Sequence, residues 1–130
     1  MTVLSIHDLR VTYQTQTGGV GAVRGVSLDI GRGEVVGLAG ESGCGKSTVA
    51  GAVLRLLPPR TTIEGEILLG DDDVLKMKAS RLRAVRWTGA SIIFQGAMHA
   101  MSPVKRIGEQ IAEAITTHNL AGKREAMARV

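Results

Sequence analysis

A run of glycines directly before Lys-Ser-Thr, in "GLAGESGCGKSTVAGAVL" (37–54), constrains this chain more than any other stretch. A short apolar run bounded by glycines, 34–40, leads into it and is typical of a strand buried on both faces. Over 46–57 the apolar residues return at helical spacing, and two prolines follow. The sequence therefore predicts that the glycines form the turn between a buried strand and an amphipathic helix.

This turn matches the pattern G-x-x-x-x-G-K-[ST] at every position, from Gly40 to Ser47. Backbone N–H groups in such a turn can surround phosphates, because glycine adopts the required backbone angles. The following helix directs its N-terminus toward the same phosphates. Lys46 is expected to reach the β- and γ-phosphates, Ser47 to ligate Mg²⁺, and Thr48 to add a phosphate contact. The predicted nucleotide-binding residues of this loop are Gly40, Glu41, Ser42, Gly43, Cys44, Gly45, Lys46, Ser47 and Thr48.

A purely structural glycine turn is the alternative, and the strand-then-helix context favours the nucleotide site over it. Elsewhere the patterns indicate a β-rich first third followed by mixed elements, which is an α/β arrangement. A turn-rich loop is expected at 15–22. Expected strands are 3–13, 23–30, 34–40, 62–70 and 90–95, and expected helices are 46–57, 74–86, 106–118 and a short one from near Gly122.

Composition limits the classes of function. With 130 residues the chain is long enough for one small domain, and its aromatic content of 2% argues against stacking platforms for single-stranded nucleic acid. The net charge of +4 comes from basic residues interrupted by acids, which indicates a solvated surface. A single cysteine excludes an internal disulfide, and neither a signal peptide nor a spanning apolar run is visible. We therefore expect a cytoplasmic location.

Four segments follow one another along the chain, and the second contains the phosphate loop: LSIHDLRVTY (4–13), a long stretch over 22–49, IEGEILLGDDDV (63–74) and SIIFQ (91–95). Together they resemble the amino-terminal half of an ATP-binding cassette (ABC) transporter ATPase. The resemblance implies an α/β fold of the P-loop NTPase class, ABC ATPase type, with an amino-terminal antiparallel β layer and without the carboxy-terminal half of the domain. It implies the division 1–33 (β layer), 34–95 (phosphate-loop core) and 96–130 (start of the helical region).

The resemblance also assigns two residues outside the loop. Tyr13 matches the aromatic residue that stacks on adenine, although a strand-edge tyrosine is its plain alternative. Gln95 matches the glutamine that contacts Mg²⁺ and the attacking water and senses the membrane partner; a simple turn residue is the alternative. The implied cofactors are ATP and Mg²⁺, with Lys46 and Gln95 in catalysis and Ser47 and Gln95 at the metal.

Two stretches resemble the oligopeptide/dipeptide/nickel importer branch of the family: 56–87 and "FQGAMHAMSPVKRIGEQIAEAI" (94–115). The branch implies a second ATPase subunit, identical or related, membrane-spanning permease subunits, and an extracytoplasmic solute-binding protein that acts indirectly. It places the chain in the cytoplasm, peripheral on the inner face of the cell membrane. The loop after Gln95 would contact the permease, with these apolar candidates, each of which could equally be a packed surface residue: Ala97, Met98, Met101 and Pro103.

Three parts of the family's active site do not occur in this sequence: an LSGGQ-like signature, four apolar residues ending in Asp-Glu, and the downstream switch histidine. Phosphoryl transfer depends on positioning and charge stabilisation, so we expect the chain to bind ATP and hydrolyse it slowly or not at all. Three functions stay open. They are the ATP-binding portion of a peptide importer, a non-hydrolysing ATP-binding regulatory fragment, and a soluble P-loop ATPase that acts on nucleic acid.

Overall fold

A computed structural model describes residues 1–94, 96 and 101–130 of the chain. These residues form two compact units, Met1–Ala90 and Ser91–Val130, which are described separately. Among the helices of the described part, none has the length and apolar content needed to cross a membrane. The predicted division at residues 33 and 95 stays a prediction.

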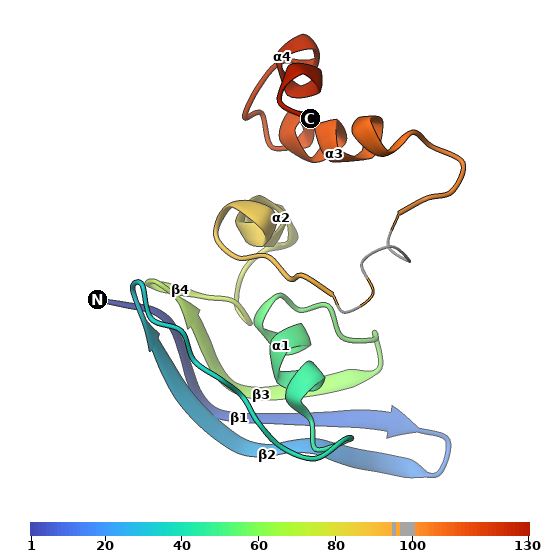
Figure 1. Ribbon diagram of the computed structural model, residues 1–130. Coiled ribbons are helices and arrows are strands. Elements are labelled where there is room, and N and C mark those ends of the chain that lie inside the picture. Colours follow the sequence, from blue (N-terminus) through green and yellow to red (C-terminus); the bar gives the residue numbers. More distant parts are fainter. Residues whose placement is uncertain (95, 97–100) are drawn as a thin grey trace. The chain divides into compact units, whose positions relative to one another are not determined.

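The first unit is built on an antiparallel sheet with strand order β2-β1-β3-β4 (Figure 1). Its strands are β1 (Thr2–Thr15), β2 (Gly18–Gly31), β3 (Thr61–Leu69) and β4 (Asp72–Asp73). The period-two patterns at 3–13, 23–30 and 62–70 are therefore confirmed as strands. The loop predicted at 15–22 is shorter than expected, because β2 already begins at Gly18 and pairs with Thr15.

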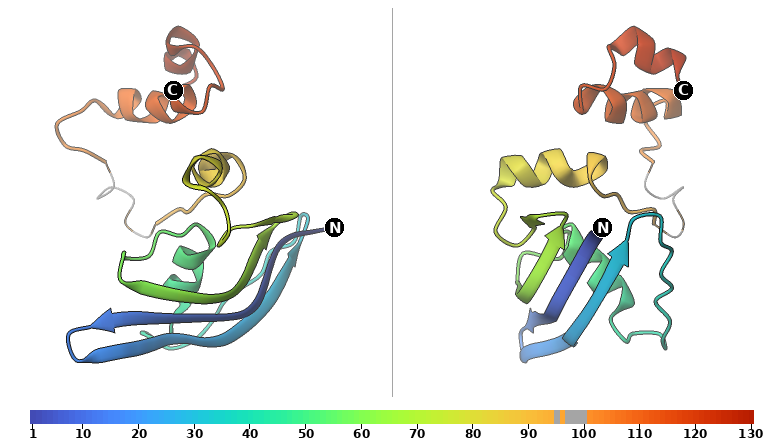
Figure 2. Two further views of the ribbon diagram at one scale, coloured as in Figure 1. Left: turned by 180° about the vertical axis from the view of Figure 1, so that it is seen from behind. Right: turned by 90° about the vertical axis from the view of Figure 1, so that its left-hand side faces the viewer.

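β1 contains a bulge at Asp8, where φ is 43° and the register to both neighbouring strands shifts. The facing glycines make room for it. A Cβ at Gly25 would lie 2.7 Å from Asp8 Oδ1, and a Cβ at Gly65 would lie 2.6 Å from Asp8 O. Bulges bend strands and increase their twist, and the sheet is strongly curved, with its concave side toward the first helix (Figures 1 and 2).

The helix α1 (Lys46–Val53) packs on that concave face and buries Val49 and Ala52. The core around it consists of aliphatic side chains from the sheet, the turn after β4 and α2: Ile6, Leu9, Val11, Val23, Ile67, Val74 and Leu82. The helix predicted over 46–57 is too long. It ends because Arg55 adopts φ 50° and the Leu56 N–H bonds to Gly51 O at 2.9 Å. A left-handed residue at the end of a helix is usually glycine, so an arginine at this position does not predict the end of the helix.

The apolar run 34–40 is not a strand, and the prediction of a strand buried on both faces is wrong. Val35 is 97% exposed, and no described strand pairs with this segment. A strand of that kind needs hydrogen-bonded neighbours and covering layers on both sides, which the described residues do not supply. The strand predicted over 90–95 is likewise not formed at residues 91–94, where Ile93 is 92% exposed.

The second helix, α2 (Ala79–Thr88), begins later than predicted, because residues 74–76 form a turn that Asp73 stabilises. Its carboxylate accepts a bond from the Leu75 N–H at 2.9 Å, and its carbonyl accepts the N–H groups of Lys76 and Met77, each at 3.1 Å. α2 is also kinked near its end, with Trp87 at φ 81°.

The second unit contains α3 (Ile107–Thr117) and α4 (Lys123–Ala128), which confirms the helices predicted at 106–118 and near Gly122. The two helices pack through small side chains. Ala112 and Ala126 are buried, and a Cβ at Gly108 would already lie in van der Waals contact with α4 and the residues after it. Small residues therefore set how closely the helices approach.

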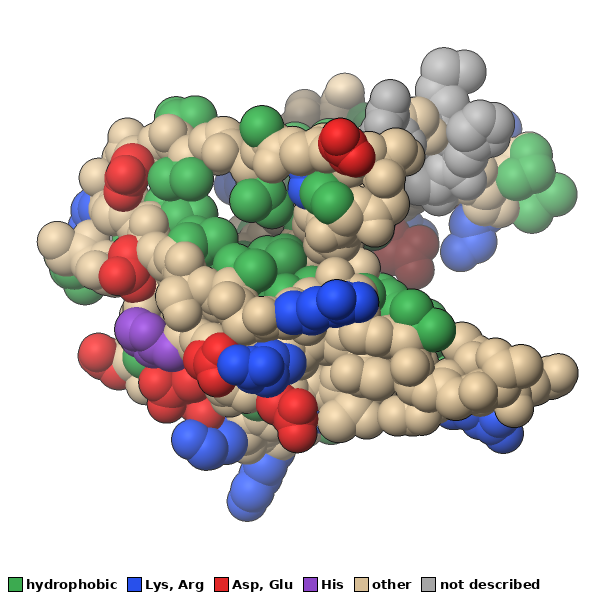
Figure 3. All heavy atoms as spheres, turned by 90° about the horizontal axis from the view of Figure 1, so that it is seen from below, with side chains coloured by type: hydrophobic (Ala, Val, Ile, Leu, Met, Phe, Trp, Pro, Cys, Tyr) green, Lys and Arg blue, Asp and Glu red, His purple; other side chains and the backbone are tan. Residues whose placement is uncertain are grey.

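The outer face of the sheet carries side chains of both signs (Figure 3). Arg10 pairs with Asp8 at 2.9 Å and lies opposite Glu64 in the register, and His7 lies opposite Glu66. The hydrogen bond and charge of Asp8 raise the pKa of Arg10. Nucleic-acid-binding faces are usually stripes of one sign, so this face does not favour the nucleic-acid hypothesis.

Candidate nucleotide-binding site

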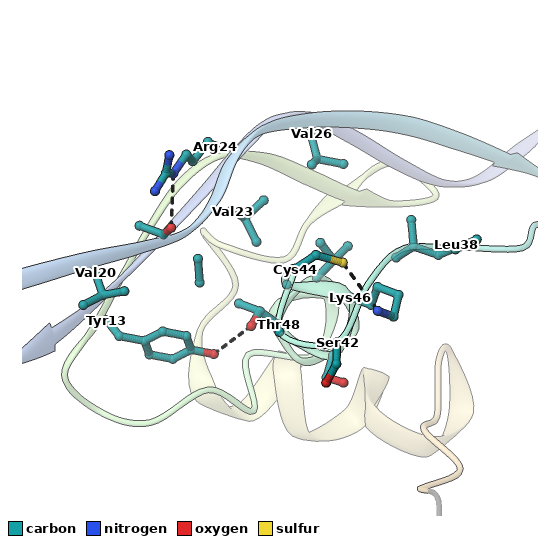
Figure 4. Close-up of a pocket in the computed structure, with 17 residues that line it drawn as sticks. Tyr13, Val20, Val23, Arg24, Val26, Leu38, Ser42, Cys44, Lys46 and Thr48 are labelled. Carbon is teal, nitrogen blue, oxygen red and sulfur yellow. Dashed lines mark hydrogen bonds between the residues drawn. The ribbon is translucent and has the colours of Figure 1, made fainter.

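A cavity of about 900 Å³ lies in the first unit between the β1–β2 hairpin and the phosphate loop (Figure 4). Tyr13 and Val20 come from the hairpin, and Leu38 comes from the segment before the loop. Residues 21–24 and Val26 of β2 add to the lining. The rest of the wall is the loop and the start of α1, which contain these predicted site residues: Ser42, Gly43, Cys44, Gly45, Lys46, Ser47 and Thr48. The fold thus brings Tyr13 and most of the predicted loop to one cavity, and their roles stay predictions.

Glycine is required at one position of the loop in particular. Gly45 has φ 99°, and a Cβ there would lie 2.5 Å from the backbone oxygen of Ala22 on β2. Backbone atoms cannot move aside as a flexible side chain can, so only glycine lets the loop approach the sheet this closely. Gly43 also has a left-handed φ of 81°, but a Cβ there would meet no atom of the non-neighbouring residues within 4 Å.

The N-terminus of α1 opens at this loop. Its N-cap is Gly45, which has no side chain to satisfy the first N–H groups, and the first helical bond runs from the Val49 N–H to Gly45 O at 2.9 Å. The N–H groups of the first turn have no partner within the helix and carry the positive end of its dipole. A phosphate group matches these donors in charge and geometry.

Lys46 lies folded over the loop. Its ammonium group donates to Gly40 O at 2.7 Å and Glu41 O at 2.6 Å, and it also contacts Cys44 Sγ at 3.4 Å. These contacts keep the positive charge beside the nest of N–H groups. Because charge-assisted bonds to phosphate are stronger than bonds to neutral carbonyls, the ammonium can exchange one carbonyl for a phosphate oxygen without leaving the loop.

The two hydroxyls after Lys46 have different surroundings. Ser47 is exposed, as a metal ligand needs to be, whereas Thr48 is half-buried. Thr48 Oγ1 lies 3.1 Å from the hydroxyl of Tyr13, which connects the loop helix directly to the hairpin (Figure 4).

Several predicted residues cannot be compared with the structure. Gln95, Ala97 and Met98 lie outside the described residues. Met101 and Pro103 are described in the second unit, and both are exposed.

Gln110 is a residue of this region that the sequence analysis did not single out. Its side-chain amide accepts from the Ser102 N–H at 2.8 Å and donates to Ser102 O and Lys105 O at 3.0 Å each. One side chain of α3 therefore holds the segment 102–105. Gln110 is the glutamine of "IGEQI" (107–111) in the sequence. Its hydrogen bonds to residues 102 and 105 depend on how the chain folds, so the sequence alone does not predict them.

Comparison with known proteins agrees with this geometry. The sequence model of the family described as ABC transporter matches residues 23–129. The chain belongs to the ABC transporter family. Its relatives include the dipeptide transport ATP-binding protein DppD of Bacillus subtilis, 38% identical, and the probable D,D-dipeptide transport ATP-binding protein DdpD of Escherichia coli, 42% identical. Each alignment covers 98% of this chain and 39% of the relative, so the chain spans about two fifths of these proteins.

A solved structure supports the fold. The ATP-binding cassette MJ0796, determined as a dimer bound to ADP and Pi, superposes with a TM-score of 0.77 over 97% of this chain and 53% of that chain. At 21% sequence identity this similarity concerns the fold alone. It confirms the ABC ATPase type of P-loop fold with an amino-terminal antiparallel layer, of which this chain covers about half.

Proposed function

We propose that this chain binds ATP with Mg²⁺ and is the amino-terminal portion of the ATP-binding subunit of an ABC importer. The observation that carries the proposal is the cavity in which the phosphate loop and Tyr13 face each other. Its loop side offers the N–H groups of the first turn of α1 and an ammonium group for phosphates, and its hairpin side offers an aromatic ring for a base.

Individual roles follow from this arrangement. The residues from Gly40 to Thr48 would hold the phosphates, with Lys46 on the β- and γ-phosphates. Tyr13 would stack on adenine. Ser47, whose hydroxyl is exposed, would hold Mg²⁺ together with Gln95. When bound, the metal neutralises phosphate charge.

The names of the relatives support peptides or similar solutes as the transported substrates of the whole protein. Its partners would be permease subunits, contacted through the segment after Gln95, and a second ATPase subunit. The exposed Met101 and Pro103 support such a contact. This function places the protein on the cytoplasmic face of the cell membrane.

We expect the chain of 130 residues to hydrolyse ATP slowly, because the signature, the Asp-Glu pair and the switch histidine of the family do not occur in it. We therefore expect nucleotide binding without efficient hydrolysis in this chain. The test measures the nucleotide Kd and the rate of phosphate release on the same sample. Hydrolysis at a rate ordinary for the family would contradict the expectation.

The test of binding is a calorimetric titration with ATP and Mg²⁺. Lys46→Ala should weaken binding by about tenfold or more, because a charge-assisted bond to phosphate is lost. Lys78→Ala removes an exposed lysine at the N-cap of α2 and should leave the affinity unchanged. Equal affinity in wild type and Lys46→Ala would refute the proposed site.

A further inference from the structure

The hydroxyls of Tyr13 and Thr48 lie within hydrogen-bond distance of each other, and the roles proposed above give this contact no function. The Tyr13 hydroxyl lies 3.1 Å from Thr48 Oγ1, and the ring extends from β1 toward α1 (Figure 4). We propose that the Thr48 hydroxyl positions the Tyr13 ring, and that this contact makes the site prefer a nucleotide with a base over a bare polyphosphate. The inference rests on the proposed function and adds a determinant of specificity to it.

The backbones that carry the two side chains are fixed independently of their contact. Tyr13 is paired with Val20 on β2 and with Thr61 on β3, so the sheet sets its position. The start of α1 is held against β2 by the close approach of Gly45 to Ala22. With both ends fixed, the hydrogen bond selects the orientation of the ring and does not have to hold the elements together.

Thr48 is suited to this role in a way that Ser47 is not. Neighbouring residues on a helix point about 100° apart, so the two hydroxyls face different surroundings. Ser47 is exposed, while Thr48 is half-buried beside the buried Val49. A hydroxyl has one donor and two acceptor positions. Thr48 can therefore accept from Tyr13 and still donate to a phosphate, and an experiment has to separate the two functions.

A stacking contact benefits from a ring that is already oriented, because no rotamer freedom is then lost on binding. One hydrogen bond of this kind corresponds to about a fivefold change in affinity. The benefit applies only to ligands that stack on the ring. Tripolyphosphate has the phosphates of ATP without its base, so it can use the loop but not Tyr13.

The experiment measures Kd for ATP and for tripolyphosphate, both with Mg²⁺, on the full chain and its variants. Thr48→Val should weaken ATP binding about fivefold and change tripolyphosphate binding less than twofold, whereas Thr48→Ser, which keeps the hydroxyl, should bind ATP like the wild type. Tyr13→Phe keeps the ring and should reproduce the effect of Thr48→Val. The double variant should be no weaker than either single one, because both remove the same bond.

Thr88→Val is the matched control, since the Thr88 hydroxyl bonds to Ala84 O within α2, outside the cavity lining. It should change neither affinity. Equal weakening of both ligands by Thr48→Val would overturn the inference and assign Thr48 to the phosphates. An unchanged ATP affinity in both Thr48→Val and Tyr13→Phe would overturn it as well. A wild-type chain that binds neither ligand would instead refute the proposed function.

Discussion

β1 and the segment 34–40 both line the cavity beside the phosphate loop, but they are held in different ways. β1 is paired on both sides and buries Ile6, Leu9 and Val11. The segment 34–40 pairs with no described strand and is fixed near its ends, where the Glu34 carboxylate accepts the Gly31 N–H and Gly40 O accepts from Lys46. One wall of the cavity is therefore held by a ladder of bonds, and the other by a few contacts.

The contrast shows what determines the shape of the site. A paired strand keeps its position when one contact is lost, because many others remain. A segment attached at its ends depends on each attachment. Substitutions at such attachments should therefore disturb the site more than their number of contacts suggests. Three variants compare the loss of single contacts elsewhere in the first unit: at the phosphate loop, at the end of α1 and at β4.

The largest effect is expected at Gly45, where the phosphate loop meets β2. Gly45→Ala should lower the free energy of unfolding by about 3 kcal/mol, since it combines a left-handed backbone with a clash against Ala22 O. Nucleotide affinity should fall with it. Gly43→Ala is the matched variant, because its φ is also left-handed but no atom lies within 4 Å of the added carbon. It should cost only about 1 kcal/mol.

Urea denaturation gives the free energy of unfolding of both glycine variants, and ATP titrations give their nucleotide affinity. Similar losses of stability at Gly43 and Gly45 would mean that backbone conformation alone matters. The close approach to β2 would then not be an attachment point.

A smaller effect is expected at Arg86, which holds the other end of α1. Its guanidinium donates to Leu54 O at 3.0 Å and to Arg55 O at 2.9 Å, at the left-handed turn that ends the helix. Arg86→Met keeps much of the side-chain volume but leaves these carbonyls without their charged donor, so unfolding should become easier by about 2 kcal/mol. Thermal and urea unfolding measure this loss.

Arg83→Met serves as the control for Arg86, because Arg83 is an exposed arginine of the same helix. It should change stability by less than about 0.5 kcal/mol. If the two variants lose the same stability, the bonds to the end of α1 contribute nothing beyond surface charge.

The smallest effect is expected at Asp73, the last residue of the short strand β4. Burial alone would raise the pKa of this carboxyl, but the bonds from Lys76 and the Leu75 N–H outweigh burial and hold the pKa below its usual range. A carboxyl with a lowered pKa stabilises the fold above its unfolded pKa, near 4, and this stabilisation is lost as the pH falls through the folded value.

Asp73→Asn should therefore be less stable than wild type by about 1 kcal/mol at pH 7, and the difference should shrink as the pH falls below about 4. Asp71→Asn is the control, at an exposed carboxyl of the turn between β3 and β4, and should change stability by less than about 0.5 kcal/mol at pH 7. Urea denaturation across pH 3 to 7 would decide the matter, and a difference for Asp73 that does not change with pH would contradict the assignment.

The sheet and the loop could be predicted from sequence for a local reason. Period-two alternation at 3–13 and the strict glycine pattern before Lys46 depend only on neighbouring residues. The segment 34–40 could not be predicted correctly. Its apolar residues favour burial, but they do not specify which strand or layer would cover them. The role of Gln110 was also out of reach, since its amide bonds to residues 102 and 105, which no periodicity links to it.

The bulge at Asp8 has a consequence for how this family member can vary. Ile6 lies inward before the bulge and Leu9, Val11 and Tyr13 lie on one face after it, so the odd–even parity of β1 changes at Asp8. The orientation of Tyr13 toward the cavity is thus decided five positions upstream. Substitutions between the bulge and Tyr13 can keep this orientation, whereas inserting or deleting one residue there would turn Tyr13 to the other face of the sheet.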